Sequence, residues 1–543
     1  MGLQNHRFPV ELYTHRRFIP ARSPVDFMRD SMTPLNHLPR CYAWLLLSPL
    51  FLLSTLSYAE SPPNIVLILA DDLGWNAVGY RNPRMKTPNL DRLVSEGVEL
   101  RNFYVAPMCS PTRAGLLTGR YPIRFGSARA VIPPQRDHGL PVSETTLAEL
   151  LEPLGYQHRG IFGKWHLGHR RTKWHPLNRG FSHFVGHYNG AIDYFDLTRE
   201  GERDWHQQFS PSDESGYATD LIAKAASDFI RQSSETGTPY FCYVPFNAPH
   251  SPFQAPSESI AKFKSMNDIK MSDVKNRRSM IERLQVYAAM ICRMDQGIGR
   301  ILEAVKQSGN AENTIVWFLS DNGGVGNIWR NNHPLRGSKL TVYEGGIRVP
   351  AAVRWPRKIS AGTQIHSTVG YIDLLPTLLA ATGRENLDNN HLKIDGINLL
   401  PLLTQDSSDE DAKKDLTKQK IDERAWFSYH GQQGEHNEHL SVLQNGWKLK
   451  VNGPRFTGLD DLKKSGVTHE LFYLATDPLE QRDLSQENME TVKNLAKLLV
   501  DHRQLQPSSA VPPYNVGKQG FIPPKDWQAK PDAPDKLLGS HDQ

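Results

Sequence analysis

The chain is poor in cysteine, with four among its 543 residues, which is too few for a stabilising disulfide framework. It also lacks a block of Lys and Arg. Most of the formal charge of +5 lies in residues 1–59, so the sequence has no electrostatic footprint for nucleic acid. With 39% hydrophobic and 22% charged residues, the composition excludes disorder throughout and indicates a globular protein with a sizeable core.

Long apolar runs are also scarce, and the longest, residues 43–57, lies near the N-terminus. Arg40 precedes it and Ser57-Tyr58-Ala59 follows, which is the order of a signal peptide and its cleavage site. The run is shorter than the ~20 residues that span a bilayer, although an uncleaved anchor is the alternative. We therefore expect residues 1–59 to be a leader and the processed chain to be exported without a stable membrane span.

Asn-x-Ser/Thr sequons are absent after residue 59, whereas exported eukaryotic enzymes of this size commonly carry some. This absence favours a bacterial envelope over a lysosome. We expect a periplasmic or secreted protein.

Strand and helix patterns alternate over residues 60–404. The apolar runs at 64–70, 240–244 and 314–319 are typical of strands buried on both faces, while 217–232 and 281–307 have helical patterns. This alternation predicts an α/β fold with a large, mostly parallel sheet sandwiched by helices. Ligands of such sheets bind beyond the carboxyl ends of the strands.

The C-terminal part has a different pattern. Residues 405–424 are charged and are expected to form a linker. Short strand patterns and a helix over 485–503 predict a smaller antiparallel α+β domain at 425–506, with Asn445-Gly446 as a hairpin turn. The proline-rich residues 507–543 are expected to form an extended surface tail or to be disordered.

Cys109 lies in the most distinctive segment, residues 107–120. Pro111 suits the first position of a helix with Ser110 as its cap, so Cys109 would lie just outside the helix N-terminus, where free N–H groups favour an anion. Arg113, one turn further along, would face the same place. By itself, however, a cysteine is more often a buried structural thiol, and this is how we interpret Cys242 and Cys292.

Oxygen ligands follow two of the predicted strands. Asp71-Asp72 comes directly after 64–70, and Asp321-Asn322 follows 314–319. Adjacent carboxylates at a buried strand end repel each other unless a cation neutralises them. Carboxylate and amide oxygens suit Ca²⁺ or Mg²⁺ and not Zn²⁺, although Asp-Asn-Gly-Gly is also good turn chemistry.

The motif Cys109-x-Pro111-x-Arg113, followed by Leu-Leu-Thr-Gly, resembles the signature of the sulfatase family, of the arylsulfatase A/B type with an alkaline-phosphatase-like fold. Three further segments resemble elements of the same family in the same order, from about residue 62 to residue 400. These are Gly163-Lys164-Trp165-His166, Pro249-His250-Ser251-Pro252 and Arg336-Gly337-Ser338-Lys339.

The resemblance implies an enzyme that hydrolyses a sulfate ester. It implies that a maturation enzyme oxidises Cys109 to Cα-formylglycine, whose hydrate is the nucleophile. One Ca²⁺, with Mg²⁺ as the alternative, would be held by Asp71, Asp72, Cys109, Asp321 and Asn322. The implied catalytic residues are Cys109, Arg113, Lys164, His166, His250 and Lys339.

Roles follow from the same resemblance. Lys164, His250 and Lys339 would hold the sulfate, with His250 protonating the leaving oxygen and His166 taking a proton from the nucleophile. We expect His187, Asn189 and Asp193 to line the mouth of the pocket and to bind substrate. The substrate class would be a sulfated saccharide, of the galactose or N-acetylgalactosamine type, or an aryl sulfate.

Two alternatives remain at this stage. A phosphatase or phosphodiesterase of the same superfamily would use Ser or Thr and commonly two transition metals, which Cys109 and the hard-oxygen ligands argue against. An inactive carbohydrate-binding relative would have lost catalytic residues, whereas this chain retains the expected set.

Overall fold

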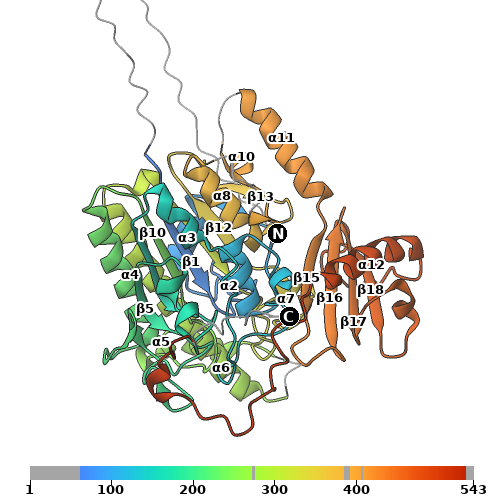
Figure 1. The fold of residues 1–543 in the computed structure, drawn as a ribbon, viewed down its shortest axis with the longest axis horizontal. Helices are drawn as coiled ribbons and strands as arrows, with labels where there is room; N and C mark the ends of the chain where they lie inside the picture. Colours follow the sequence, from blue (N-terminus) through green and yellow to red (C-terminus); the bar gives the residue numbers. More distant parts are fainter. Residues whose placement is uncertain (1–60, 272–274, 385–391, 405–407, 533–543) are drawn as a thin grey trace, which may run out of the picture. The chain divides into compact units, whose positions relative to one another are not determined.

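Strand β1 (Asn64–Ala70) lies inside a ten-stranded sheet, and all of its residues are buried. Ile65, Leu67 and Leu69 belong to one hydrophobic core, and the alternate residues between them belong to a second. Because successive side chains of a strand point to opposite faces, both faces of the sheet are covered, as the apolar run predicts. The computed structural model describes residues 61–271, 275–384, 392–404 and 408–532 (Figure 1), so the predicted leader lies outside the described residues.

The central strands of this sheet are parallel. β1 pairs in parallel with β10 (Tyr240–Pro245) and with β11 (Thr314–Ser320). The series continues in parallel through β4 (His158–Lys164) to β5 (His183–His187). The flanking antiparallel pairs involve β12 (Ala351–Arg354) and β8 (His206–Gln207). The full order is β13 (Thr363–Ile365), β2 (Val98–Leu100), β12, β11, β1, β10, β4, β5, β8 and β9 (Ser210–Pro211). The predicted large, mostly parallel sheet is confirmed.

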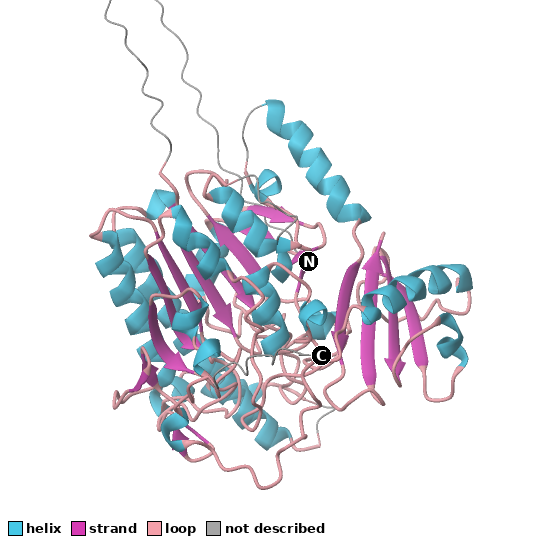
Figure 2. Cartoon of the chain, in the orientation of Figure 1, coloured by secondary structure: helices cyan, strands magenta, loops and turns pink. Residues whose placement is uncertain are grey.

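Helices cover both faces of this sheet (Figure 2). One core takes its helical residues from α1 (Pro88–Ser95), α4 (Ala218–Ser234) and α6 (Arg277–Gln307). The helices of the other core include α2 (Cys109–Thr118), α3 (Leu147–Leu151) and α8 (Leu374–Ala381). Shorter elements are β3 (Phe103–Tyr104), β6 (Thr198–Arg199), β7 (Glu202–Arg203), α5 (Ser257–Ala261), α7 (Glu344–Ile347), β14 (Val369–Gly370) and α10 (Leu400–Leu403).

A smaller antiparallel sheet follows, as predicted. Its strands are β15 (Trp426–His430), β16 (Glu438–Gln444), β17 (Trp447–Gly453) and β18 (Thr468–Tyr473), paired in chain order. The turn between β16 and β17 has positive φ at both Asn445 (51°) and Gly446 (78°), which a two-residue primed hairpin turn requires. Helix α12 (Met489–Gln504) packs against β16 and β17.

The two flanking segments differ in part from what the sequence predicts. The charged segment contains a helix, α11 (Ser408–Glu423), because its Glu, Lys, Gln and Ala residues favour a helix even without an apolar face. The described part of the tail, residues 507–532, contacts the part of the chain that forms the ten-stranded sheet and its helices. Val511 N–H donates to Gly126 O at 2.8 Å, and Trp527 is fully buried. Within the described residues, no helix has both the length and the apolar character needed to cross a membrane.

Candidate active site

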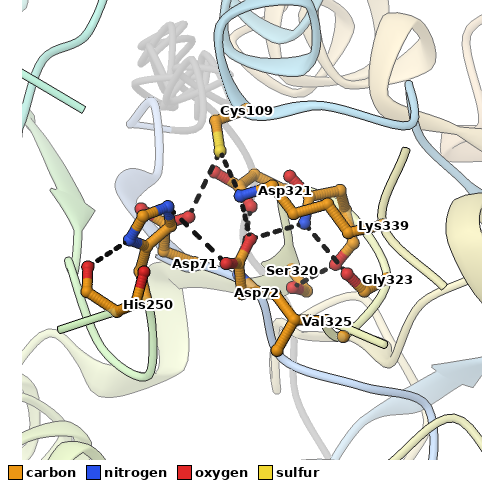
Figure 3. A network of polar contacts seen from close by, with 12 residues as sticks. Asp71, Asp72, Cys109, His250, Ser320, Asp321, Gly323, Val325 and Lys339 are labelled. Atoms are coloured by element: carbon orange, nitrogen blue, oxygen red, sulfur yellow. Dashed lines mark hydrogen bonds and ion pairs between the residues drawn. The ribbon is translucent and has the colours of Figure 1, made fainter. Parts of the chain in front are cut away.

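The polar side chains that the sequence predicts for the site meet at the carboxyl ends of the strands of the large sheet (Figure 3). Asp71 and Asp72 follow β1, and Asp321 follows β11. Lys164 is the last residue of β4, and His250 lies in the loop after β10. Residues that are far apart in the chain are thereby brought into one polar cluster.

Helix α2 places Cys109 in this cluster. It begins at Cys109, with the extended Met108 as its N-cap, and ends at Thr118, with Gly119 as a C-cap that has a left-handed φ of 66°. The predicted start was therefore wrong by two residues. Ser110 is not the cap, and its Oγ instead accepts a hydrogen bond from Ile132 N–H at 3.2 Å. Cys109 Sγ lies 3.4 Å from Asp71 Oδ1 and 3.4 Å from Lys339 Nζ.

Asp72 links Lys339, Asn322 and Asp321 within the cluster. Its Oδ1 accepts from Lys339 Nζ at 2.6 Å and from Asn322 Nδ2 at 2.7 Å, and its N–H donates to Asp321 Oδ1 at 3.3 Å. Burial opposes the charge of Asp72, but Lys339 and His250 outweigh it and lower the pKa of that carboxyl. Burial, together with the charge of Asp71, raises the pKa of Asp321 to about 6.

Arg113 and Lys164 lie behind these carboxylates, with both side chains fully buried. Arg113 donates to Asp321 Oδ2 from Nε at 3.1 Å and from Nη2 at 2.8 Å, and its Nη1 donates to Lys164 O at 2.8 Å. Lys164 Nζ forms an ion pair with Asp71. Because Arg113 pairs with Asp321 and Lys164 pairs with Asp71, these two side chains are positioned to orient the carboxylates. Lys339 also pairs with Asp72, but its side chain lines the cavity.

The donor set fits a hard cation. The ligand atoms of Asp71, Asp72, Cys109 and His250 all lie within 4.8 Å of one another. Two buried oxygens, Asp72 Oδ2 and Asn322 Oδ1, have no hydrogen-bond partner among the described residues. Since buried polar atoms are nearly always partnered, these two oxygens, together with the carboxylates of Asp71 and Asp321, are what a Ca²⁺ or Mg²⁺ site offers.

The two histidines present different nitrogens to the site. His166 Nε2 lies 3.1 Å from Ile132 O, and a carbonyl only accepts, so Nε2 carries the hydrogen and Nδ1 keeps its lone pair. Burial and the nearby Lys164 and Arg113 lower the pKa of His166 and keep the ring neutral. His250 Nδ1 instead donates to Ser251 O at 2.5 Å, and its Nε2 lies 3.6 Å from Asp72 Oδ2.

A cavity of about 450 Å³ opens above Cys109. Among the described residues that line it, none is Asp or Glu, and its two cationic side chains are Lys339 and Arg199. The full set is Cys109, Val131, Ile132, Pro133, Pro134, His166, Gly190, Ala191, Arg199, His250, Ser251, Pro252, Lys339, Leu340, Gln432 and Tyr514.

The residues expected at the mouth of the pocket lie elsewhere. His187 and Asn189 are fully buried, and neither they nor Asp193 line the cavity. Asn189 N–H and Nδ2 both donate to Asp204 at 2.9 Å, so this stretch supports the loop whose Gly190 and Ala191 do reach the cavity. Arg199, Gln432 and Tyr514 were missed, because no local pattern links three positions so distant in the chain.

Comparison with known proteins agrees with this arrangement. The family profile described as Sulfatase matches residues 63–384, and the profile of the N-sulphoglucosamine sulphohydrolase C-terminal region matches residues 337–505. An N-acetylgalactosamine-6-sulfatase of Mus musculus is 32% identical over 523 residues, covering 88% of this chain and 92% of its own. Arylsulfatase J of Mus musculus is 31% identical, covering 87% of this chain and 79% of its own.

A solved structure is also similar. The crystal structure of Ps i-CgsB in complex with k-i-k-neocarrahexaose has 28% sequence identity and a TM-score of 0.70. The match covers 83% of this chain and 95% of that one.

Proposed function

Since the chain belongs to the sulfatase family of sulfuric ester hydrolases, we propose that it is an exported enzyme that removes a sulfate ester from a saccharide. The observation that carries this proposal is Cys109, which lies at the start of α2 between Asp71 and Lys339 and at the base of the cavity. A helix N-terminus and a lysine together favour the negative charge of a sulfuryl group. A phosphatase of the same superfamily would present Ser or Thr here.

The sugar is a galactose-type unit in this proposal. One relative is named for N-acetylgalactosamine 6-sulfate chemistry, and a similar structure was solved with a neocarrahexaose. The cavity of about 450 Å³ falls in the ~300–1,000 Å³ range of small-molecule sites, so a sulfate alone would leave much of it unfilled. An aryl sulfate fits the same chemistry and serves as a reporter substrate.

Activity requires two groups that the chain acquires. A maturation enzyme converts Cys109 to Cα-formylglycine, and Asp71, Asp72, Asp321 and Asn322 hold one Ca²⁺, or Mg²⁺. When bound, the hydrated aldehyde supplies the attacking hydroxyl and the cation supplies positive charge beside it. The partnerless oxygens Asp72 Oδ2 and Asn322 Oδ1 support the cation.

The chain's own residues account for the other steps. Lys339 Nζ, 3.4 Å from Cys109 Sγ, neutralises charge on the sulfuryl oxygens, and losing one such donor typically costs about 3–4 kcal/mol of barrier. His250 lines the cavity and acts as an imidazolium: Nδ1–H stays on Ser251 O, the proton on Nε2 goes to the leaving oxygen, and the carboxylate of Asp72, 3.6 Å from Nε2, favours the charged form. His166, with the lone pair on Nδ1, takes a proton from the nucleophile before sulfate departs.

Export belongs to the same proposal. It is supported by the order of Arg40, the apolar run 43–57 and Ser57-Tyr58-Ala59, which matches a cleavable signal peptide. We place the processed enzyme in the periplasm or outside the cell.

The test is to measure sulfate and phosphate release from matched nitrophenyl esters and from a galactosamine 6-sulfate, side by side. The proposal predicts sulfate release from both sulfate esters and far slower phosphate release. Faster phosphate release would favour the phosphatase alternative, and no release of either ion by protein matured at Cys109 would favour the inactive relative.

A further inference from the structure

A second positively charged side chain lines the cavity above Cys109, and it has no role in the hydrolysis proposed above. Arg199, on the short strand β6, lines its wall, while Lys339 lies at the base beside Cys109. With no Asp or Glu among the described lining residues, the wall around Arg199 has no carboxylate of its own facing the cavity. This cavity therefore favours a ligand with more than one negative group.

Arg199 is anchored but not fully paired. Its carbonyl oxygen accepts from Trp527 Nε1 at 2.9 Å, and Trp527 is fully buried, so the backbone at this position is held. Its Nη2 lies 3.2 Å from Glu200 Oε1 in a partly exposed pair, and pairs of this kind contribute little. Its Nε is buried and has no partner among the described residues.

Gln432 and Tyr514 line the same cavity from two other parts of the chain. Tyr514 N–H donates to Gln432 O at 2.9 Å, and Gln135 Nε2 donates to Tyr514 O at 2.7 Å. Arg136 Nη2 donates to Pro513 O at 2.9 Å and to Val516 O at 3.0 Å. The tail (red in Figure 1) is thus fixed against the cavity, although both family matches end before it, at residues 384 and 505.

Gln432 also carries an unused polar atom. Its Oε1 is buried and lacks a hydrogen-bond partner among the described residues. Arg199 Nε is a donor and Gln432 Oε1 is an acceptor, and both belong to residues that line the cavity. Since both residues line the cavity and neither side chain is fully paired, a ligand that offers an anion and a hydroxyl would provide partners for them.

We propose that Arg199, Gln432 and Tyr514 form a subsite for the part of the saccharide beyond the sulfate ester, and that Arg199 binds a second anionic group there. That group is a carboxylate or a further sulfate, both of which a guanidinium binds well. Tyr514 presents an aromatic face to the sugar, and Gln432 accepts from a hydroxyl. This inference rests on the proposed function and names its substrate class, an acidic saccharide with at least two charged groups.

The probes are three forms of one disaccharide with a terminal N-acetylgalactosamine 6-sulfate. In the first its neighbour is a hexuronic acid, in the second the methyl ester of that acid, and in the third a neutral hexose with one sulfate. For each, kcat/KM is measured, together with inhibition of nitrophenyl sulfate hydrolysis, which reports binding even if a disaccharide is not cleaved. Arg199→Gln is compared with Arg231→Gln, a control on α4 whose partner is the exposed Asp228.

Wild type should prefer at least one of the two doubly charged forms over the ester by about tenfold or more. Which form it prefers distinguishes carboxylate from sulfate. Arg199→Gln should remove that preference, and Arg231→Gln should keep it. Tyr514→Ala should weaken the binding of all three disaccharides to a similar extent. The proposal is overturned if wild type does not discriminate, or if Arg199→Gln keeps the preference. In either case, the proposed function would still hold if the enzyme hydrolyses nitrophenyl sulfate. If matured enzyme does not hydrolyse nitrophenyl sulfate, both the proposed function and this inference are contradicted.

Discussion

Arg113 holds Asp321 by two nitrogens of its guanidinium, Nε at 3.1 Å and Nη2 at 2.8 Å from the same Oδ2. Neither side chain is exposed to solvent. Asp321 in turn accepts from Asp72 N–H at 3.3 Å, so one arginine orients a carboxylate that follows β11 and, through it, the turn that follows β1. The arginine of the Cys-x-Pro-x-Arg motif thus acts on the candidate cation ligands.

Replacing this arginine should weaken the cation site. Arg113→Lys keeps the charge but cannot reproduce the fork on Asp321 or the bond to Lys164 O. We expect about 10–100-fold weaker cation affinity or activity, the usual cost of losing support for a metal ligand. The check is to titrate Ca²⁺ into chelated enzyme and follow nitrophenyl sulfate hydrolysis. An unchanged midpoint and rate, as expected for the exposed control Arg231→Lys, would rule out this role.

Removing the cation should abolish turnover, and Ca²⁺ or Mg²⁺ should restore it. The reason is the ligand set: the carboxylates of Asp71 and Asp72 lie close together, Asp321 accepts from Asp72 N–H, and Asn322 Oδ1 is buried without a partner among the described residues. The measurement is hydrolysis after chelation, dialysis and addition of single metals. Recovery with Zn²⁺ alone would instead indicate the phosphatase alternative.

Replacing His250 and replacing His166 should change the kinetics of hydrolysis in different ways. If His250 protonates the leaving oxygen, His250→Ala should lose about 10²–10⁴-fold more on a sugar sulfate than on nitrophenyl sulfate, whose leaving group needs no proton. His166, with a free lone pair on Nδ1, should act after the alcohol has left. His166→Ala should therefore slow both substrates to a similar rate and release a burst of alcohol.

Rapid-quench kinetics on both variants separates these roles. Equal losses of His250→Ala on the two substrates would show that His250 is not the acid. A burst in His250→Ala, with none in His166→Ala, would exchange the two assignments.

Lys448 should matter for stability more than for chemistry. Its side chain is 1% exposed and pairs at 2.8 Å with both Glu344 and Glu480, which are fully buried. Lys448→Met leaves two carboxylates with less compensating charge, so unfolding should become easier by roughly 3–5 kcal/mol. Urea unfolding followed by fluorescence measures this. The matched control is Lys493→Met, whose pair with Glu490 is exposed at 3.9 Å and should change stability by less than about 1 kcal/mol; equal effects of the two variants would contradict the account.

Local patterns predicted both sheets of the fold, but not helix α11 in the segment expected to form a linker. The apolar run 64–70 is β1, buried on both faces, and Asn445-Gly446 forms the expected hairpin turn. The start of α2 was misplaced because proline is tolerated throughout the first helical turn, where N–H groups have no partner within the helix. Pro111 is the third residue of the helix and not the first.

The cavity wall was much less predictable. His187 and Asn189 were expected to line the mouth of the pocket, but Asp204, 15 residues after Asn189, accepts the hydrogen bonds of Asn189 in the interior. Tyr514 reaches the cavity through backbone hydrogen bonds to Gln432 and Gln135. Such contacts join distant segments, and periodicity along the chain carries no information about them.

The central claim is that Cys109 is the precursor of the nucleophile, and it is tested by the mass of one peptide. Trypsin should release Asn102–Arg113, which contains Cys109, from enzyme made with a maturation system. The account predicts a peptide about 18 Da lighter than the cysteine form, because an aldehyde replaces the thiol-bearing carbon, with its fraction rising in proportion to specific activity. Fully active enzyme in which this peptide retains only unmodified cysteine would contradict the account.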